Sequence, residues 1–192
     1  MKRLILITWL LLPVAHAEEG TSNVPVLDPE QLESYQFENR AEESLVTIKE
    51  LSTGQHYTLD SDRQAMKELA TRRLGILSFH QNKKDLEVIQ KLIDRKAIGQ
   101  DDVRAWQSLG VVFGDVLAQE LNMHWVSYED ELGVSKALQW KKTENYVFPV
   151  TMFSKRVKFK DEIDVIMLFE RMKLDVESFK RYEAIHGRIQ KS

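Results

Sequence analysis

The 192-residue sequence contains no cysteine, and this absence excludes several kinds of protein at once. Without cysteine the chain has no disulfide bond, no thiol nucleophile and no cysteine-bound metal ion. A lipid-anchored lipoprotein, which needs a cysteine at its cleavage point, is excluded as well. Hydrophobic packing must therefore hold the fold together.

The sequence also lacks a basic surplus and the short motifs of familiar enzymes. It has 27 basic against 30 acidic residues, so nothing favours binding to nucleic acid or anionic lipid. No glycine-rich dinucleotide loop, Walker lysine loop, G-x-S-x-G elbow, H-E-x-x-H pair or EF-hand loop is present. After residue 17 no two histidines lie three or four positions apart, so we expect neither a metal site nor a cofactor.

No apolar run is long enough for a membrane anchor, but the N-terminus has the three parts of a secretory signal. Lys2 and Arg3 precede the apolar run 4–12, which Thr8 alone interrupts, and the small-x-small site at 15–17 follows. Nine residues at about 1.5 Å each cover roughly half of a ~30 Å hydrocarbon core. We therefore predict cleavage after Ala17, a periplasmic location and no stable membrane anchor after cleavage.

Cleavage leaves residues 18–192, enough for one domain with a hydrophobic core. Residues 18–44 contain small and turn-forming residues with few large apolar groups, so we predict a flexible leader followed by a single domain over 45–192. Without Lys2 and Arg3 the chain carries 25 basic against 30 acidic residues, a net charge of −5.

The first half of this domain is predicted to be helical. Residues 45–59 carry β-branched residues around Ser52-Thr53-Gly54, which predicts either a short hairpin or an extended arm. Three helices follow, the first capped by Asp60 or Ser61, the second spanning 85–96 before Gly99, and the third opening at 101–102. Apolar residues recur at three and four positions in each: Met66, Leu69, Ala70, Leu74 and Leu77; Leu86, Ile89, Leu92 and Ile93; Val103, Trp106, Leu109, Phe113, Val116, Leu117 and Leu121. We expect the third helix to be the most buried.

The apolar period then changes from 3.6 to 2. Segments 123–128 and 134–140 predict an antiparallel hairpin with positive φ at Gly133, and 145–148 a third strand. Pro149 suits the first turn of a helix whose inner stripe is Val150, Phe153 and Val157. Two further helices are expected over 161–172 and 175–189. The predicted fold class is therefore α+β: helices, a small antiparallel meander and C-terminal helices in one domain.

Two glycines and one charged segment stand out for their positions. Gly110 and Gly114 lie one turn apart in the third helix, where each costs about 0.8–1 kcal/mol relative to alanine. We expect another element to approach that face closely. At the hairpin, we expect Asp130 either to be solvated or to pair with Arg156 beside a groove lined by Trp125, where the arginine holds a carboxylate or phosphate.

The stretch 85–171 resembles a bacterial family known only as domain of unknown function 3806. The resemblance rests on the segments Leu109-Gly110-Val111-Val112-Phe113-Gly114-Asp115, Trp125-Val126, Glu129-Asp130 with Gly133, Phe148-Pro149-Val150 and Lys155-Arg156. It implies a bacterial origin and the order helix, meander, helix, but no activity, substrate or cofactor. The candidate binding residues are Asp115, Trp125, Glu129, Asp130, Lys155 and Arg156, and the candidate structural residues are Gly110, Gly114, Gly133 and Pro149.

Three functions remain open at this level. The leading hypothesis is a periplasmic, non-catalytic binding or envelope-associated module whose partner is an unknown protein or envelope component. An envelope hydrolase or accessory enzyme would use Asp115, Glu129 or Asp130, although adjacent strand residues point to opposite faces and make a poor acid–base pair. A structural homodimer would use the aromatic and methionine-rich stretch 163–179.

Overall fold

The computed structural model describes residues 46–186, and its first elements differ from the sequence prediction. Strand β1 spans Thr47–Lys49 and helix α2 spans Thr53–Leu74. Ser52 caps α2 through a capping box with Gln55, so residues 52–54 begin a helix and the predicted hairpin is wrong. The expected caps Asp60 and Ser61 lie inside α2. The predicted signal segment and leader, residues 1–44, fall outside the described residues.

Helix α2 ends at Gly75, which has a left-handed φ of 72°. Leu77, predicted to lie on its apolar stripe, is beyond the helix and 71% exposed. Helix α3 spans Lys84–Asp94, close to the predicted bounds, but it ends before Gly99.

Helix α4, Val103–Leu121, is the central helix of the fold. Asp102 caps it by accepting a hydrogen bond from the Ala105 N–H. Twelve of its residues are buried, as expected for the third predicted helix, although Val103 at its first turn is exposed. Burial along nearly every side means that α4 contacts other elements all around its axis.

The sheet has four antiparallel strands in the order β1-β2-β3-β4, one more than predicted. Strands β2, Met123–Asp130, and β3, Gly133–Trp140, form the expected hairpin, and β4 is Tyr146–Val147. The turn is tighter than expected, because Asp130 pairs with Gly133 in the register. Gly133 has a φ of 118°, which glycine adopts without strain. Strand β1 pairs with β2 and so joins α2 to the sheet.

The C-terminal part contains a 3₁₀ turn, Pro149–Thr151, helix α5, Met152–Phe159, and helix α6, Val165–His186. The prediction of two helices after residue 161 is wrong: α6 continues through Asp175, which is exposed. Its apolar residues Met172, Val176 and Phe179 keep the three- and four-residue spacing across the predicted break.

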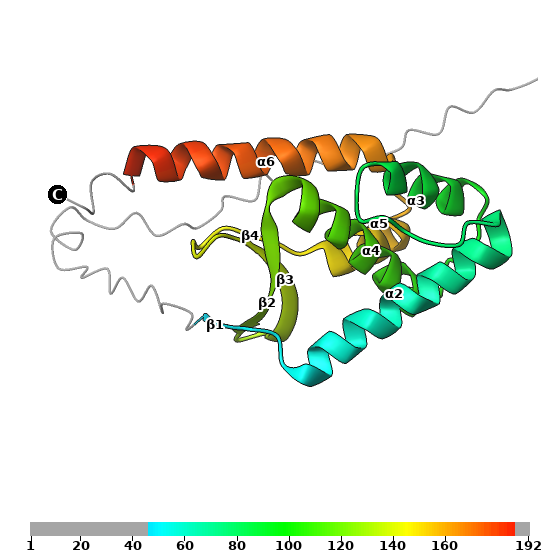
Figure 1. Cartoon of the computed structure of the whole chain (residues 1–192), viewed down its shortest axis with the longest axis horizontal. Helices are drawn as coiled ribbons and strands as arrows, with labels where there is room; N and C mark the ends of the chain where they lie inside the picture. The colour runs from blue at the N-terminus through cyan, green and yellow to red at the C-terminus, as the bar shows by residue number, and fades with distance from the viewer. Residues whose placement is uncertain (1–45, 187–192) are drawn as a thin grey trace, which may run out of the picture. The chain divides into compact units, whose positions relative to one another are not determined.

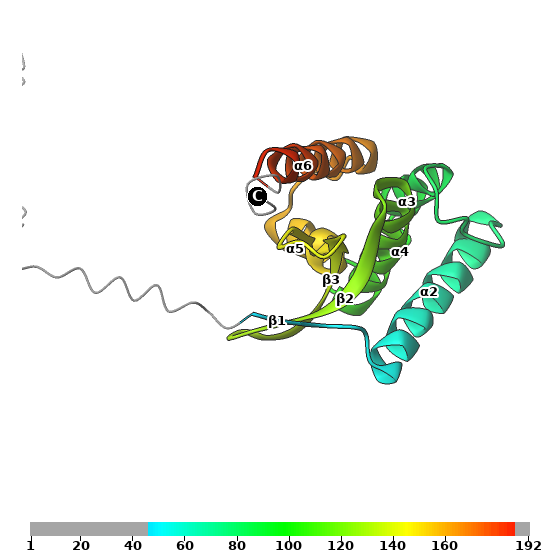
Figure 2. The same ribbon diagram turned by 60° about the vertical axis from the view of Figure 1, so that its left-hand side comes forward.

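These elements surround α4. In Figures 1 and 2, α2 lies on one side of α4 and α6 on the other, with the strands beside it. The largest fully buried side chains include Phe113 of α4, Phe153 of α5 and Phe169 of α6. The α+β fold class is confirmed. Within residues 46–186, no helix is long and apolar enough to cross a membrane.

Candidate functional site

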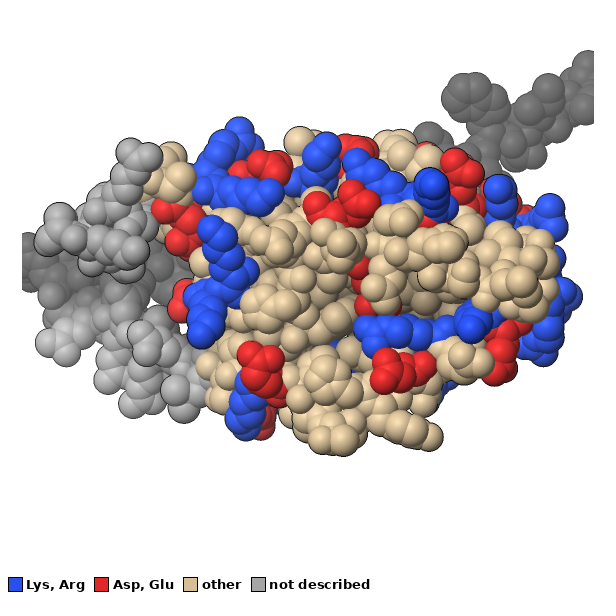
Figure 3. All heavy atoms as spheres, in the orientation of Figure 1, with Lys and Arg blue, Asp and Glu red and all other residues tan. Residues whose placement is uncertain are grey.

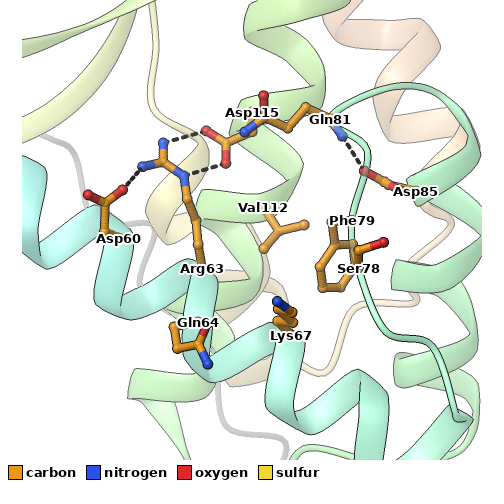
Figure 4. Close-up of a pocket in the computed structure, with 10 residues that line it drawn as sticks. All are labelled: Asp60, Arg63, Gln64, Lys67, Ser78, Phe79, Gln81, Asp85, Val112 and Asp115. Atoms are coloured by element: carbon orange, nitrogen blue, oxygen red, sulfur yellow. Dashed lines mark hydrogen bonds and ion pairs between the residues drawn. The ribbon is translucent and has the colours of Figure 1, made fainter.

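The carboxylate of Asp115 connects three elements. Its Oδ1 and Oδ2 accept hydrogen bonds of 2.7 Å each from Nη2 and Nε of Arg63 in α2. The indole Nε1 of Trp125 in β2 donates a third bond of 3.0 Å to Oδ1. Asp115 is only 7% exposed, so these partners replace the water it has lost. Figure 4 shows the paired bonds from Arg63 to the two carboxylate oxygens, the two-pronged arrangement that makes arginine–carboxylate pairs strong.

Arg63 also binds a second carboxylate. Its Nη1 donates a 2.7 Å bond to Oδ1 of Asp60, one turn earlier in α2. Hydrogen bonding to Asp115 raises the pKa of the Arg63 guanidinium above its usual value, so the side chain stays cationic. Each of the three Arg63 nitrogens thus donates one bond within the protein, which uses three of its five N–H donors.

The two glycines of α4 bring the site together. A Cβ on Gly114 would lie 2.5 Å from the Trp125 ring and 2.7 Å from the ring of Pro149. At Gly110 the obstacle is main chain: the carbonyl oxygens of Pro149 and Val150 lie 2.5 and 2.6 Å from the Cβ position. This is the close approach that the spacing of the glycines predicts, and it places the Trp125 indole next to Asp115, one residue after Gly114.

A pocket of about 240 Å³ opens beside this ion pair, between α2, α4 and the loop after α2. Lys67 lies one turn beyond Arg63 on α2, and Figure 4 shows its side chain among the lining residues. The pocket is lined by Asp60, Arg63, Gln64, Lys67, Ser78, Phe79, Gln81, Asp85, Val112 and Asp115.

Asp85 fixes the loop that forms the far wall. Its Oδ2 accepts bonds of 2.7 and 2.6 Å from the main-chain N–H groups of His80 and Gln81. Gln81 has a φ of 57°, a conformation that needs such support in a residue other than glycine. Asp85 is 1% exposed, so the loop is anchored from the protein interior.

The charged groups of the lining differ in whether they have a bonding partner within the protein. Arg63 donates hydrogen bonds to Asp60 and Asp115, and two main-chain N–H groups donate to Asp85. Within the described part of the chain, no acceptor or carboxylate lies within bonding distance of the Lys67 ammonium. Over the same residues, no group of three or more histidine, aspartate and glutamate side chains is arranged to hold a metal ion.

The predicted partners at the hairpin do not meet. Oδ1 of Asp130 accepts a bond from the Leu132 N–H within its own turn, whereas Nη1 of Arg156 donates to the Met152 carbonyl one turn back in α5. The prediction that Asp130 pairs with Arg156 is therefore wrong. Arg156 lines another hollow, of about 430 Å³, with Glu162 and Arg171 among its other residues.

The remaining candidates are also apart. Glu129 accepts a 2.9 Å bond from exposed Lys49 of β1, and Lys155 is exposed on α5. Of the six candidate binding residues, the structure brings together only Asp115 and Trp125.

Sequence reasoning missed Arg63 and Lys67. Asp60, Arg63 and Lys67 are spaced three and four apart, which places them on one face of a helix. The sequence does show this spacing. Because Asp60 was interpreted as the helix cap, however, it was placed at the start of the helix and not on a face shared with Arg63 and Lys67.

Comparison with known protein families matches the middle part of the chain. Residues 85–169 match the family model described as Domain of unknown function (DUF3806). The matched stretch begins at Asp85 and includes Asp115 and Trp125, whereas Arg63 and Lys67 precede it. The predicted resemblance to this family is confirmed. A search of the curated proteins finds no match.

One solved structure shares the fold. A crystal structure at 1.50 Å resolution from Bacteroides thetaiotaomicron VPI-5482 superposes with a TM-score of 0.60 at 17% sequence identity. The similar region covers 65% of this chain and 46% of that one, so this chain matches about half of the other protein's length. At this identity the likeness concerns the fold alone.

Proposed function

We propose that this protein is an exported, non-catalytic binding module of the bacterial cell envelope that takes a small organic acid in the pocket beside Lys67. The proposal of export rests on the N-terminal sequence: Lys2 and Arg3, the apolar run 4–12 and the site 15–17.

The observation that carries the ligand class is the unpaired ammonium of Lys67. The other charged groups of the lining have partners within the protein, so an entering carboxylate or phosphate meets one uncompensated cation. A hydrogen bond between ions is stronger than one between neutral groups. A cationic ligand would instead have to compete with Arg63 for Asp60 and Asp115.

The rest of the lining suits a small molecule with a short apolar part. Phe79 and Val112 supply apolar contact, while Gln64, Ser78 and Gln81 supply neutral polar groups. The volume of about 240 Å³ lies below the range of about 300–1,000 Å³ that is typical of pockets for drug-sized ligands. We therefore expect a ligand smaller than a typical drug molecule.

The same contacts argue against the hydrolase. An acid–base pair needs one carboxylate able to gain and lose a proton. Asp115 accepts two bonds from the Arg63 guanidinium, Glu129 is paired with Lys49, and Asp130 caps its own turn. Each of the three carboxylates therefore has a partner that serves the fold.

A thermal-shift screen of the mature protein tests the ligand class. The set contains small mono- and dicarboxylic acids and phosphate monoesters, with the primary amide of each carboxylic acid as its neutral match. We expect a subset of the acids to raise Tm, because ligand bound to the native state stabilises it, while their amides do not. Equal shifts with acids and amides, or shifts with amines only, would contradict the proposal.

Export is tested separately by intact mass and cell fractionation of the untagged protein in a Gram-negative host. We expect a chain that begins at Glu18 in the periplasmic fraction. An intact Met1 or a cytoplasmic location would refute export, whatever the ligand screen shows.

A further inference from the structure

A second hollow, of about 430 Å³, lies between α5 and the start of α6. Its volume falls within the range of about 300–1,000 Å³ that is typical of small-molecule pockets. The hollow shares no lining residue with the pocket beside Lys67, so a ligand in it is independent of the proposed function. It is lined by Arg156, Glu162, Asp164, Met167, Leu168 and Arg171.

Two arginines and two carboxylates line this hollow, yet within the described residues no ion pair joins them. Elsewhere on α6 opposite charges do meet: Lys173 lies 3.6 Å from Glu170, and Lys180 lies 2.7 Å from Glu177. Figure 3 shows basic and acidic side chains next to one another along the edge that α6 occupies in Figure 1. The hollow therefore keeps apart charges of the kind that these neighbouring pairs bring together.

Hydrogen bonds to the main chain hold one charge of each sign in place. Nη1 of Arg156, a half-buried residue, donates a 2.9 Å bond to the Met152 carbonyl one turn earlier in α5. Oδ1 of Asp164 accepts a 2.8 Å bond from the Met167 N–H and so caps α6. An arginine side chain has five N–H donors and a carboxylate has two acceptor oxygens. Each group therefore keeps bonding capacity that no described residue uses.

A ligand with a single charge fits this lining poorly. An anion drawn to the two arginines would be repelled by the two carboxylates, and a cation drawn to the carboxylates would be repelled by the arginines. A molecule that carries both charges has a partner at each end. Leu168, which is 6% exposed, offers an apolar contact between them.

We propose that this hollow binds a small zwitterion of the amino-acid type, whose carboxylate accepts hydrogen bonds from Arg156 and whose ammonium donates to Asp164. Arg171 and Glu162, both exposed, add to the attraction for the two charges of the ligand. Leu168 contacts the ligand's apolar side chain. A free amino acid and the two ends of a short peptide share this chemistry.

Titration of the isotope-labelled mature chain with L-leucine, followed by NMR, tests the site. We expect saturable shifts of the amide signals around Arg156 and Asp164. Leucinamide and N-acetyl-leucine, which each lack one of the two charges, should bind about 2- to 5-fold more weakly. Leucyl-leucine separates the two sources: binding weaker than that of leucine indicates a free amino acid, and binding as tight or tighter indicates peptide ends. No shifts near the hollow up to about 50 mM leucine, or equal binding of leucine and both derivatives, would overturn the proposal.

Two variants assign each charge of the ligand to its partner. Asp164→Asn removes the negative charge but keeps a capping side chain, because asparagine caps helices as well as aspartate does. It should weaken leucine binding about 2- to 5-fold without weakening the binding of N-acetyl-leucine, and Arg156→Gln should do the same for leucine without weakening the binding of leucinamide. Lys155→Gln, at an exposed position of α5 that does not line the hollow, is the matched control and should bind leucine as the wild type does. Losses of the same size for leucine and its derivatives would overturn the assignment of the two ends.

Discussion

At Asp115 a single carboxylate receives three hydrogen bonds, two from α2 and one from β2. No sequence pattern links Arg63, Asp115 and Trp125, because the contacts depend on how α2 and the hairpin pack on α4. Asp115 was selected from the glycine-aspartate segment at 114–115. Arg63 was missed because its spacing to Asp60 and Lys67 shows a shared helix face but not the partner across it.

Asp115→Asn should destabilise the protein by about 2 kcal/mol, because Arg63 loses its ionised partner in a site that is largely closed to water. Breaking a fully buried pair costs about 3–5 kcal/mol; Arg63 keeps 29% side-chain exposure, which lowers the penalty. Urea denaturation measures the change. Glu129→Gln is the control, since its partner Lys49 is exposed and such pairs contribute about 0–1 kcal/mol. Equal losses in the two variants would contradict the account of Asp115.

Gly114→Ala should lower the free energy of unfolding by about 1–2 kcal/mol, although alanine favours helices by about 1 kcal/mol. The added Cβ meets the Trp125 ring, whose movement would also disturb its bond to Asp115. Gly110→Ala should cost more, because main-chain oxygens cannot rotate away. Gly54→Ala, whose Cβ meets nothing nearer than 4.0 Å, should leave stability unchanged or raised. Gain of stability at all three positions would refute the close approach.

Among the elements, α3, α4 and the β2–β3 hairpin were predicted near their observed bounds, because their periodicity and caps agree. The errors lie where local composition and tertiary burial disagree. Residues 53–59 include Thr53, Gly54 and Thr58, which are poor helix formers, yet Leu59 is buried with Leu51 and Val111. That packing and the cap at Ser52 extend α2 by two turns.

Ser52→Ala should reduce the free energy of unfolding by about 1 kcal/mol, the usual loss when a capping side chain is removed. The Ser52 Oγ accepts the Gln55 N–H, while Gln55 reaches both the Ser52 N–H and Ser127 of β2. Ser61→Ala is the matched control inside the same helix and should change stability little. Thermal unfolding followed by circular dichroism measures both, and a larger loss at Ser61 would restore the cap predicted from the sequence.

At the scale of the molecule, the α+β class followed from the order of apolar periods, because a change from 3.6 to 2 and back specifies helices, a meander and helices. Strand β1 could not be predicted from apolar periods, since a three-residue edge strand has too few positions to show alternation. The pocket was also beyond reach, because its walls come from α2, α4 and the 78–81 loop, which only the packed fold brings together. Arg63 and Lys67 lie outside the family match, whereas Asp115 lies within it.

The most direct test of the proposed binding function is a calorimetric comparison of Lys67→Gln with the wild type, using an acid identified in the thermal-shift screen. Because Lys67 is exposed, loss of the ammonium should weaken binding about 2- to 5-fold, the equivalent of ~0.5–1 kcal/mol for an ion pair open to solvent. Lys158→Gln, at an exposed position of α5, should bind as the wild type does. Equal affinity in Lys67→Gln and the wild type would contradict the assignment of this pocket.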